Sequence, residues 1–232
     1  MLNVIHTVER GRYVGKIYYD EFVESPREET ELNTIITVKL RNQTIGDVEY
    51  ISQTEILEHI CDEIGVDIEE LNDSYDWRDT EKYKEKLWEF IEERTTIKNV
   101  YKYEHGGIAL STSPFNCPWD SGQIGYIYML KDIQEKYNIS DSRAEQILEA
   151  EIDMYSKYLN GDVFAYKIED EEGNLIDLYS NFYQDLDELE DLILEEIEAQ
   201  EKADEQNKLK KLKTLIKNNV PLNHRKTILE EA

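Results

Sequence analysis

Acidic side chains outnumber basic ones two to one in this chain: 52 Asp and Glu stand against 26 Lys and Arg, which gives a formal net charge of -26 over 232 residues. The excess is uneven. Residues 207–232 carry seven basic and two acidic side chains, a net charge of +5, which leaves -31 on the first 206 residues. Because solubility of a small domain needs a net charge of only about 2 to 8, the excess predicts a surface that meets a basic partner, excludes nucleic acid or imitates it.

The remaining composition predicts a folded, cytoplasmic chain. Sixteen Tyr, five Phe and three Trp distinguish it from the aromatic-poor acidic segments that stay disordered. No apolar run reaches the length of about 18 residues that a membrane span needs, and residues 1–6 lack the pattern of a secretory signal. Cys61 and Cys117 form no disulfide framework and stand in no zinc-binding spacing.

Residue patterns predict an α+β fold, mainly an antiparallel sheet packed with several helices. Runs rich in β-branched and aromatic residues predict strands, and Gly106-Gly107 and residues 170–174 mark hairpin turns. The predicted strands are residues 4–8, 13–22, 34–40, 99–103, 108–112, 124–130, 163–168 and 175–179.

Capping signals mark two of the predicted helices. Ser52 with Glu55, and Ser142 with Glu145, have the spacing in which each side chain satisfies a free backbone N–H at a helix start. Cys61 lies on the apolar face of the first of these helices and is expected in the core. The predicted helices are residues 52–65, 80–94, 131–137 and 142–160, and residues 67–80 are predicted to form an acidic turn.

The C-terminal region is the densest in charge. Residues 183–206 hold eleven carboxylates and one base, Lys202, yet four apolar side chains keep an amphipathic helical pattern, which predicts a helix with one buried face. At about 1.5 Å per residue its 24 residues span about 36 Å, so a carboxylate falls about every 3.3 Å, close to the phosphate spacing of about 3.4 Å in one DNA strand. The apolar positions are Leu186, Leu189, Ile193 and Ile197, and the pattern continues through Leu209, Leu212 and Ile216.

These patterns predict three segments: an α+β core over residues 1–182, a charged helical extension over 183–220 and a flexible tail over 221–232. The Lys-rich stretch 208–217 is the one candidate for binding phosphate, because the rest of the chain lacks a basic stripe. We expect it instead to pair with the acidic helix or to be solvated, and we expect the basic tail over residues 207–232 to shield that helix until a partner displaces it.

Residues 104–128 are the one candidate for enzyme chemistry. Cys117, His105 and Asp120 are suited to act as nucleophile, base and orienting carboxylate. Two other interpretations stay open: a structural loop in which Phe115 and Trp119 fill the core, or a loop that recognises a partner. The familiar phosphate, dinucleotide, zinc-protease and calcium motifs are missing and the four histidines are scattered, so we expect no cofactor and no metal.

One stretch resembles a known family. The run Ser111-Thr112-Ser113-Pro114-Phe115-Asn116-Cys117-Pro118-Trp119-Asp120-Ser121-Gly122-Gln123, within residues 107–128, is similar to the signature of acidic cytoplasmic proteins carried by bacteriophages and mobile elements. The match extends to residues 160–166 and 170–173, and more loosely to 25–28 and 46–47. The resemblance implies a phage or mobile-element origin and no assigned reaction, and it leaves the acidic helix and basic tail as an addition to a shared core.

Charge and resemblance together lead to one expected function. The chain is expected to be a phage-encoded inhibitor without enzymatic activity, which works in the host cytoplasm as a nucleic-acid mimic in the basic groove of a defence nuclease of the restriction or CRISPR type. The partner would be a basic, nucleic-acid-binding host protein, with no direct binding to nucleic acid or membrane, and self-association stays open. The alternatives are a small hydrolase or a nucleotide-signal-binding protein that uses residues 104–128, or a structural or regulatory phage protein. The predicted partner-binding residues are Asp185, Asp187, Glu188, Glu190, Asp191, Glu195, Glu196, Glu198, Trp119 and Asp120.

Overall fold

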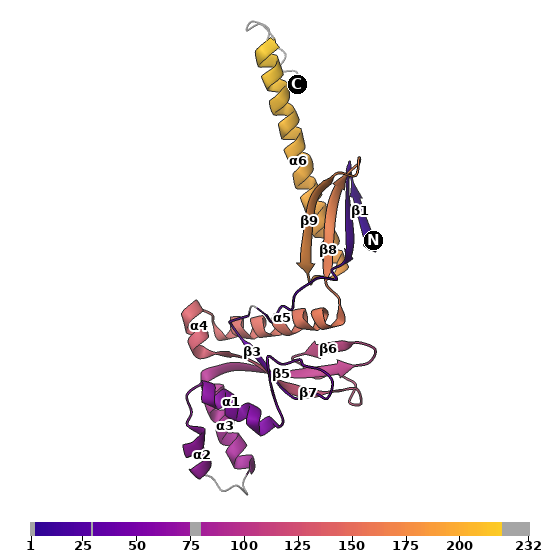
Figure 1. Cartoon of the computed structure of the whole chain (residues 1–232). Coiled ribbons are helices and arrows are strands. Elements are labelled where there is room, and N and C mark those ends of the chain that lie inside the picture. The colour runs from indigo at the N-terminus through magenta and orange to yellow at the C-terminus, as the bar shows by residue number, and fades with distance from the viewer. Residues whose placement is uncertain (1–2, 29, 75–79, 220–232) are drawn as a thin grey trace. The chain divides into compact units, whose positions relative to one another are not determined.

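The computed structural model describes residues 3–28, 30–74 and 80–219, and the chain forms two compact units (Figure 1). The terminal unit combines residues 1–23 with 163–232, and the central unit comprises residues 24–162. Both pack helices on sheets that are almost wholly antiparallel, so the predicted α+β class is confirmed. The predicted single core over residues 1–182 is instead divided, because its first strands pair with strands that follow residue 162.

The central unit is built on a five-stranded sheet with the order β4-β3-β7-β5-β6. All neighbouring strands are antiparallel except β3 and β4, which run parallel. Its strands are β3 (Thr34–Val38), β4 (Val48–Tyr50), β5 (Thr95–Glu104), β6 (Ile108–Ser111) and β7 (Ser121–Leu130), and its helices are α1 (Gln53–Glu63), α2 (Ile68–Ser74), α3 (Thr80–Arg94), α4 (Lys131–Tyr137) and α5 (Asp141–Asn160).

Helices cover both faces of this sheet (Figure 1). Because successive strand residues point to opposite faces, Ile35 of β3 packs in the cluster under α5, whereas its neighbour Ile36 packs in the cluster formed with α1 and α3. The predicted core position of Cys61 is confirmed: its thiol is fully buried on α1, and burial raises its pKa to about 12.

A buried arginine ties the start of the central unit to α5. The side chain of Arg27 is only 5% exposed and forms ion pairs with Asp47 and Glu151, the latter at 3.0 Å between Nη1 and Oε2. The same nitrogen donates to Oδ1 of Asn33 at 2.9 Å. Two carboxylates and an amide therefore satisfy a guanidinium that water scarcely reaches.

The terminal unit is a four-stranded antiparallel sheet with one long helix across it. Its order is β1-β2-β8-β9. The helix buries Leu189, Ile193 and Ile197 against a cluster on one face of the sheet, and Gly15 leaves the space that Ile193 fills, because a Cβ there would collide with Ile193. The acidic helix is thus half of this unit's core rather than an extension beside it. The elements are β1 (Val4–Arg10), β2 (Tyr13–Tyr19), β8 (Phe164–Asp170), β9 (Leu175–Phe182) and α6 (Leu186–Asn219).

Local signals in the sequence locate several element ends. The cap at Ser52 is confirmed, since its side chain accepts from the backbone N–H of Glu55 at 3.3 Å. Gly161 ends α5 with a positive φ of 75°, as predicted. The predicted start of α5 at Ser142 is wrong: Ser140 has the extended backbone of a cap and accepts from the N–H of Arg143, so the helix begins two positions earlier.

One further expectation differs from the structure, one strand was missed, and one expectation lies outside the described residues. Residues 67–80 contain the short helix α2 rather than only a turn, because Asp67 accepts from the N–H of Glu70 at 3.0 Å and caps it. The three-residue strand β4 was not predicted. The predicted flexible tail, residues 221–232, lies outside the described residues.

Candidate functional site

The carboxylates of α6 divide into two sets, and the first set points inward to the sheet. Glu190 Oε2 lies 3.0 Å from Nε2 of His6 on β1. Arg10, at the end of the same strand, holds both Glu198 and Glu201, at 3.2 and 3.3 Å. His6 and Arg10 follow one face of β1, the face that carries the buried Val8. Both cations on this face of β1 are therefore already bound to the helix.

The tight turn between β1 and β2 completes this attachment. Gly11 takes a positive φ of 59°, and a Cβ at this position would collide with Glu201. Next to the turn, Arg12 forms an ion pair with Asp204, and the hydroxyl of Tyr13 donates to the same carboxylate. Within the described residues, Asp204 is the last residue of α6 that forms an ion pair or a hydrogen bond with the sheet.

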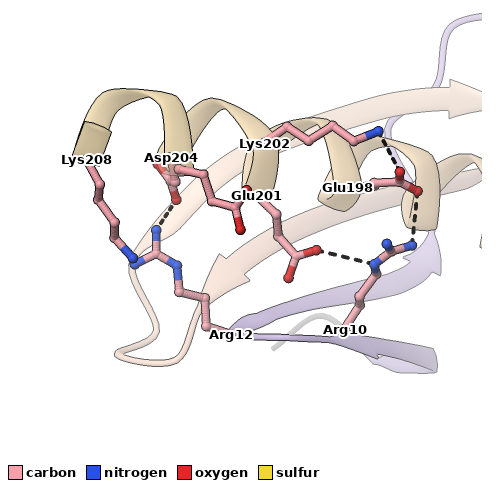
Figure 2. A pocket seen from close by; sticks show the side chains of 8 residues that line it. Arg10, Arg12, Glu198, Glu201, Lys202, Asp204 and Lys208 are labelled. Atoms are coloured by element: carbon pink, nitrogen blue, oxygen red, sulfur yellow. Dashed lines mark hydrogen bonds and ion pairs between the residues drawn. The ribbon is translucent and has the colours of Figure 1, made fainter. Parts of the chain in front are cut away.

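A charged surface hollow of about 490 Å³ lies at this attachment (Figure 2). Lys202 Nζ lies 2.6 Å from Glu198, and this hydrogen bond, with the nearby charge of Arg10, lowers the pKa of the Glu198 carboxyl. Four cations and four carboxylates line the hollow, so it has no net charge to attract an ionic ligand. Its ion pairs attach the helix to the sheet. The lining residues are Arg10, Arg12, Glu198, Glu201, Lys202, Asp204, Glu205 and Lys208.

The second set, which we call the outward stripe, consists of Asp187, Glu188, Asp191 and Glu195. All four are exposed, and none has an ion-pair partner among the described residues. Each residue turns an α-helix by about 100°, so the four lie within about 100° of one another, opposite the buried side of α6. They span about 12 Å, or about 4 Å per interval. The row of carboxylates that was predicted to span about 36 Å is therefore shorter when only unpaired carboxylates are counted. It ends where Ala199 and Lys202 follow on the same side of α6.

The structure places the other predicted partner-binding residues of α6 as follows. Asp185 is exposed, whereas Glu190, Glu196 and Glu198 are half-buried. Tyr166 is buried beneath the helix, and burial together with the charge of Glu196 raises the pKa of its hydroxyl. The inward role of Glu190 and Glu198 was not predicted. The alternation of His6, Val8 and Arg10 places two cations on the buried face of β1, but it does not identify α6 as the element that they meet.

The basic stretch does not fold back on the acidic one. Residues 186–219 form one continuous helix, so about 27 Å of helical rise separates Glu195 from Lys213. Residues 208–217 therefore do not shield the outward acidic residues by folding back on them, and residues 220–232 of the predicted shielding tail lie outside the described residues.

The loop at residues 104–128 brings the three predicted catalytic residues together, with the carboxylate in the middle. Asp120 Oδ2 lies 3.6 Å from His105 Nδ1 and 3.7 Å from Cys117 Sγ. A catalytic triad needs the base in contact with the nucleophile. Among residues 104–128, all of which the structure describes, no hydrogen bond joins Cys117 to His105, and the His105 side chain is 74% exposed.

Trp119 stands out on this loop because it is 92% exposed. Two hydrogen bonds to backbone carbonyls hold the loop around it: Ser121 Oγ donates to the Cys117 carbonyl at 2.5 Å, and the Glu104 N–H donates to the Asp120 carbonyl at 3.0 Å. Phe115 packs on Tyr103, with 5.6 Å between ring centroids, but it is only half-buried. The expectation that both rings fill the core is wrong, because Phe115 stays partly exposed and the ring of Trp119 lies in solvent.

No family model matches the chain, and neither the curated proteins nor the solved structures include a significant match. The resemblance of residues 107–128 to a phage-borne family therefore stays a prediction. Two further findings concern residues 3–28, 30–74 and 80–219: they contain no cluster of three or more His, Cys, Asp or Glu side chains suited to a metal ion, and no helix apolar and long enough to cross a bilayer.

Proposed function

We propose that this protein is a non-enzymatic binding protein whose outward stripe occupies a basic groove that otherwise holds nucleic acid. The observation that carries the proposal is the pairing pattern of α6: its inward carboxylates are bound to the sheet, whereas Asp187, Glu188, Asp191 and Glu195 are exposed and unpaired. A surface of unpaired charge on a fixed scaffold is suited to binding an opposite charge.

The attachment of α6 supports the proposal further. Leu189, Ile193 and Ile197 are fully buried on the opposite side of α6 and fix the helix to the sheet, so the stripe loses little conformational freedom when it binds. The average interval of about 4 Å is close to the phosphate interval of about 3.4 Å in one DNA strand. The stripe has the charge of about four phosphates, enough to compete for a groove but not to fill a long one.

The partner class follows from charge complementarity. Proteins that bind the nucleic-acid backbone do so with Lys and Arg, and such binding weakens as salt rises. Among these proteins, a defence nuclease of the restriction or CRISPR type is the proposed partner, in keeping with the motif resemblance. The hydrolase alternative gains no support from residues 104–128, because Asp120 lies between the proposed nucleophile and base.

The test is affinity capture from a host lysate, with the full chain immobilised and duplex DNA added as competitor. The proposal expects a nucleic-acid-binding protein that duplex DNA and about 0.5 M salt both release, since either removes or screens the contacts of the stripe. A variant with Asp187→Asn, Glu188→Gln, Asp191→Asn and Glu195→Gln should not capture it.

A matched control keeps the total charge change the same. The substitutions Asp62→Asn, Asp73→Asn, Glu85→Gln and Glu92→Gln neutralise four exposed carboxylates of the central unit. This control should capture the partner as the natural chain does. Equal loss in both variants would reduce the effect to net charge, and capture that DNA does not displace would contradict mimicry.

A further inference from the structure

Among the described strands, none lies beneath the C-terminal half of α6 (Figure 1). After Asp204, every described side chain up to residue 219 is exposed except Ile216. Leu209, Leu212 and Leu215 are 41%, 42% and 59% exposed. Within the described part of the chain, these three leucines therefore have no apolar surface packed over them that would remove them from water.

One side of α6 changes sign along its length. With a turn of about 100° per residue, Asp191, Glu195, Leu209, Lys213 and Lys217 lie within about 80° of one another around the helix. All five are exposed. The same side is therefore acidic where the sheet supports the helix and basic where the helix extends past the sheet, and the two parts carry charges that would attract each other if they could meet.

We propose that α6 of a second copy covers this side, running antiparallel about a two-fold axis at residue 204. In this register, residues equally far from 204 face each other. Glu195 of one copy then lies opposite Lys213 of the other, Asp191 opposite Lys217, and Ala199 opposite Leu209. Two-fold symmetry forms every pair twice, so four ion pairs flank two contacts between leucine and alanine.

The charges also decide against other arrangements. Two parallel helices in register would place Glu195 beside Glu195 and Lys213 beside Lys213, which repel. The antiparallel arrangement leaves both sheets unobstructed, because each basic half projects past its own sheet and lies against the acidic half of the other copy. Exposed ion pairs contribute little each, so the association is weak and sensitive to salt.

Self-association would also regulate binding, because Asp191 and Glu195 belong to the outward stripe. A second copy and a basic partner would compete for them. Only this consequence depends on the proposed function; self-association itself is measured with the protein alone.

The test is sedimentation equilibrium of the full chain at about 50 mM and about 500 mM salt, which bracket strong and weak screening. The lower salt should favour the dimer. Glu195→Lys alone and Lys213→Glu alone should each raise the dimer dissociation constant by about tenfold or more, because each creates two repulsive pairs. An equal mixture of the two variants should form a heterodimer at least as tightly as the natural chain, since every reversed charge then meets its opposite.

Matched controls carry the same charge changes away from this side. Glu171→Lys lies in the turn between β8 and β9, and Lys211→Glu lies on α6 about 160° around from Lys213. Neither control should show the rescue: Lys211→Glu mixed with Glu195→Lys, and Glu171→Lys mixed with Lys213→Glu, should associate no better than the single variants. A chain that stays monomeric at low salt, or a mixture that associates no better than its two components, would overturn the proposal. Circular dichroism of each variant checks that α6 remains helical.

Discussion

The central and terminal units use ion pairs in opposite ways. In the central unit, Arg27 is 5% exposed and lies inside a three-layer arrangement with helices on both faces of the sheet. In the terminal unit, Arg10 and Arg12 are each 41% exposed and hold a single helix against one face. The ion pairs of Arg27 are buried in the central unit. Those of Arg10 and Arg12 lie at the surface of the terminal unit and attach its helix to its sheet. This difference leaves the outer side of α6 available for a partner.

The largest expected effect concerns the buried ion pairs of Arg27. Arg27→Met leaves Asp47 and Glu151 without their cation, so we expect it to lower the unfolding free energy of the central unit by about 3 to 5 kcal/mol. Arg12→Met in the terminal unit should lower it by only about 0 to 1 kcal/mol, because water already screens that pair. Denaturant unfolding followed by hydrogen exchange in each unit measures both. Equal losses of unfolding free energy in the two variants would contradict the difference between the buried and the exposed ion pairs.

The next effect tests the one-sided core of the terminal unit. Ile193 is fully buried between α6 and the sheet. Ile193→Ala should lower the unfolding free energy of this unit by about 3 kcal/mol through lost burial and the cavity left behind. Leu209→Ala, on the part of α6 past the sheet, should change it by less than about 0.5 kcal/mol in the monomer. Similar losses at both positions would mean that the exposed half of α6 is also packed.

A smaller effect follows from pH. The pKa of Glu169 on β8 is lowered because Lys16 and Lys167 donate to its carboxylate. A carboxyl whose folded pKa lies below its unfolded value stabilises the fold above the unfolded value, and that contribution is lost as pH falls through the folded pKa. The ordinary pKa of a glutamate carboxyl is 4.5, so the stabilising contribution of Glu169 should be lost below this pH. Glu169→Gln should flatten the pH dependence of terminal-unit hydrogen exchange in this range, and an unchanged slope would contradict the assignment.

The smallest effect concerns the exposed loop of the central unit. Trp119→Ala should change the unfolding free energy by less than about 0.5 kcal/mol, because its ring touches mainly water. Trp88→Ala is the matched control: this ring packs edge-on against the buried Tyr126 at 5.2 Å between centroids, so its loss should be clearly larger. A large cost at Trp119 would show that the loop packs it after all.

Local signals explain which parts of the fold could be predicted from the sequence. Ser52 and Gly161 mark helix ends through their own backbone chemistry, and the two-residue alternation around Ile35 and Ile36 marks a sheet covered on both faces. The helix α2 was missed because a helix of seven residues is too short for a periodic apolar pattern. Its remaining signal was Asp67, which caps the helix.

Pairing between distant segments could not be predicted in the same way. Ile17 lies opposite Tyr166 in the sheet of the terminal unit, although 148 residues separate them in the sequence. The apolar pattern of a strand shows which side is buried but does not identify its neighbour. The outward stripe could be located from the buried positions of α6 alone. The inward set could not, because its partners Arg10 and Arg12 come from the other end of the chain.

One measurement tests most directly the division of the α6 carboxylates into an outward and an inward set. It is the affinity of the captured partner for two variants of the full chain. The outward variant neutralises Asp187, Glu188, Asp191 and Glu195, and the inward variant carries Glu198→Gln, Glu201→Gln and Asp204→Asn. We expect the outward variant to bind about 100-fold more weakly, through the loss of four ion pairs, and the inward variant to bind within about threefold of the natural chain. An inward variant that loses as much affinity as the outward one would contradict the account.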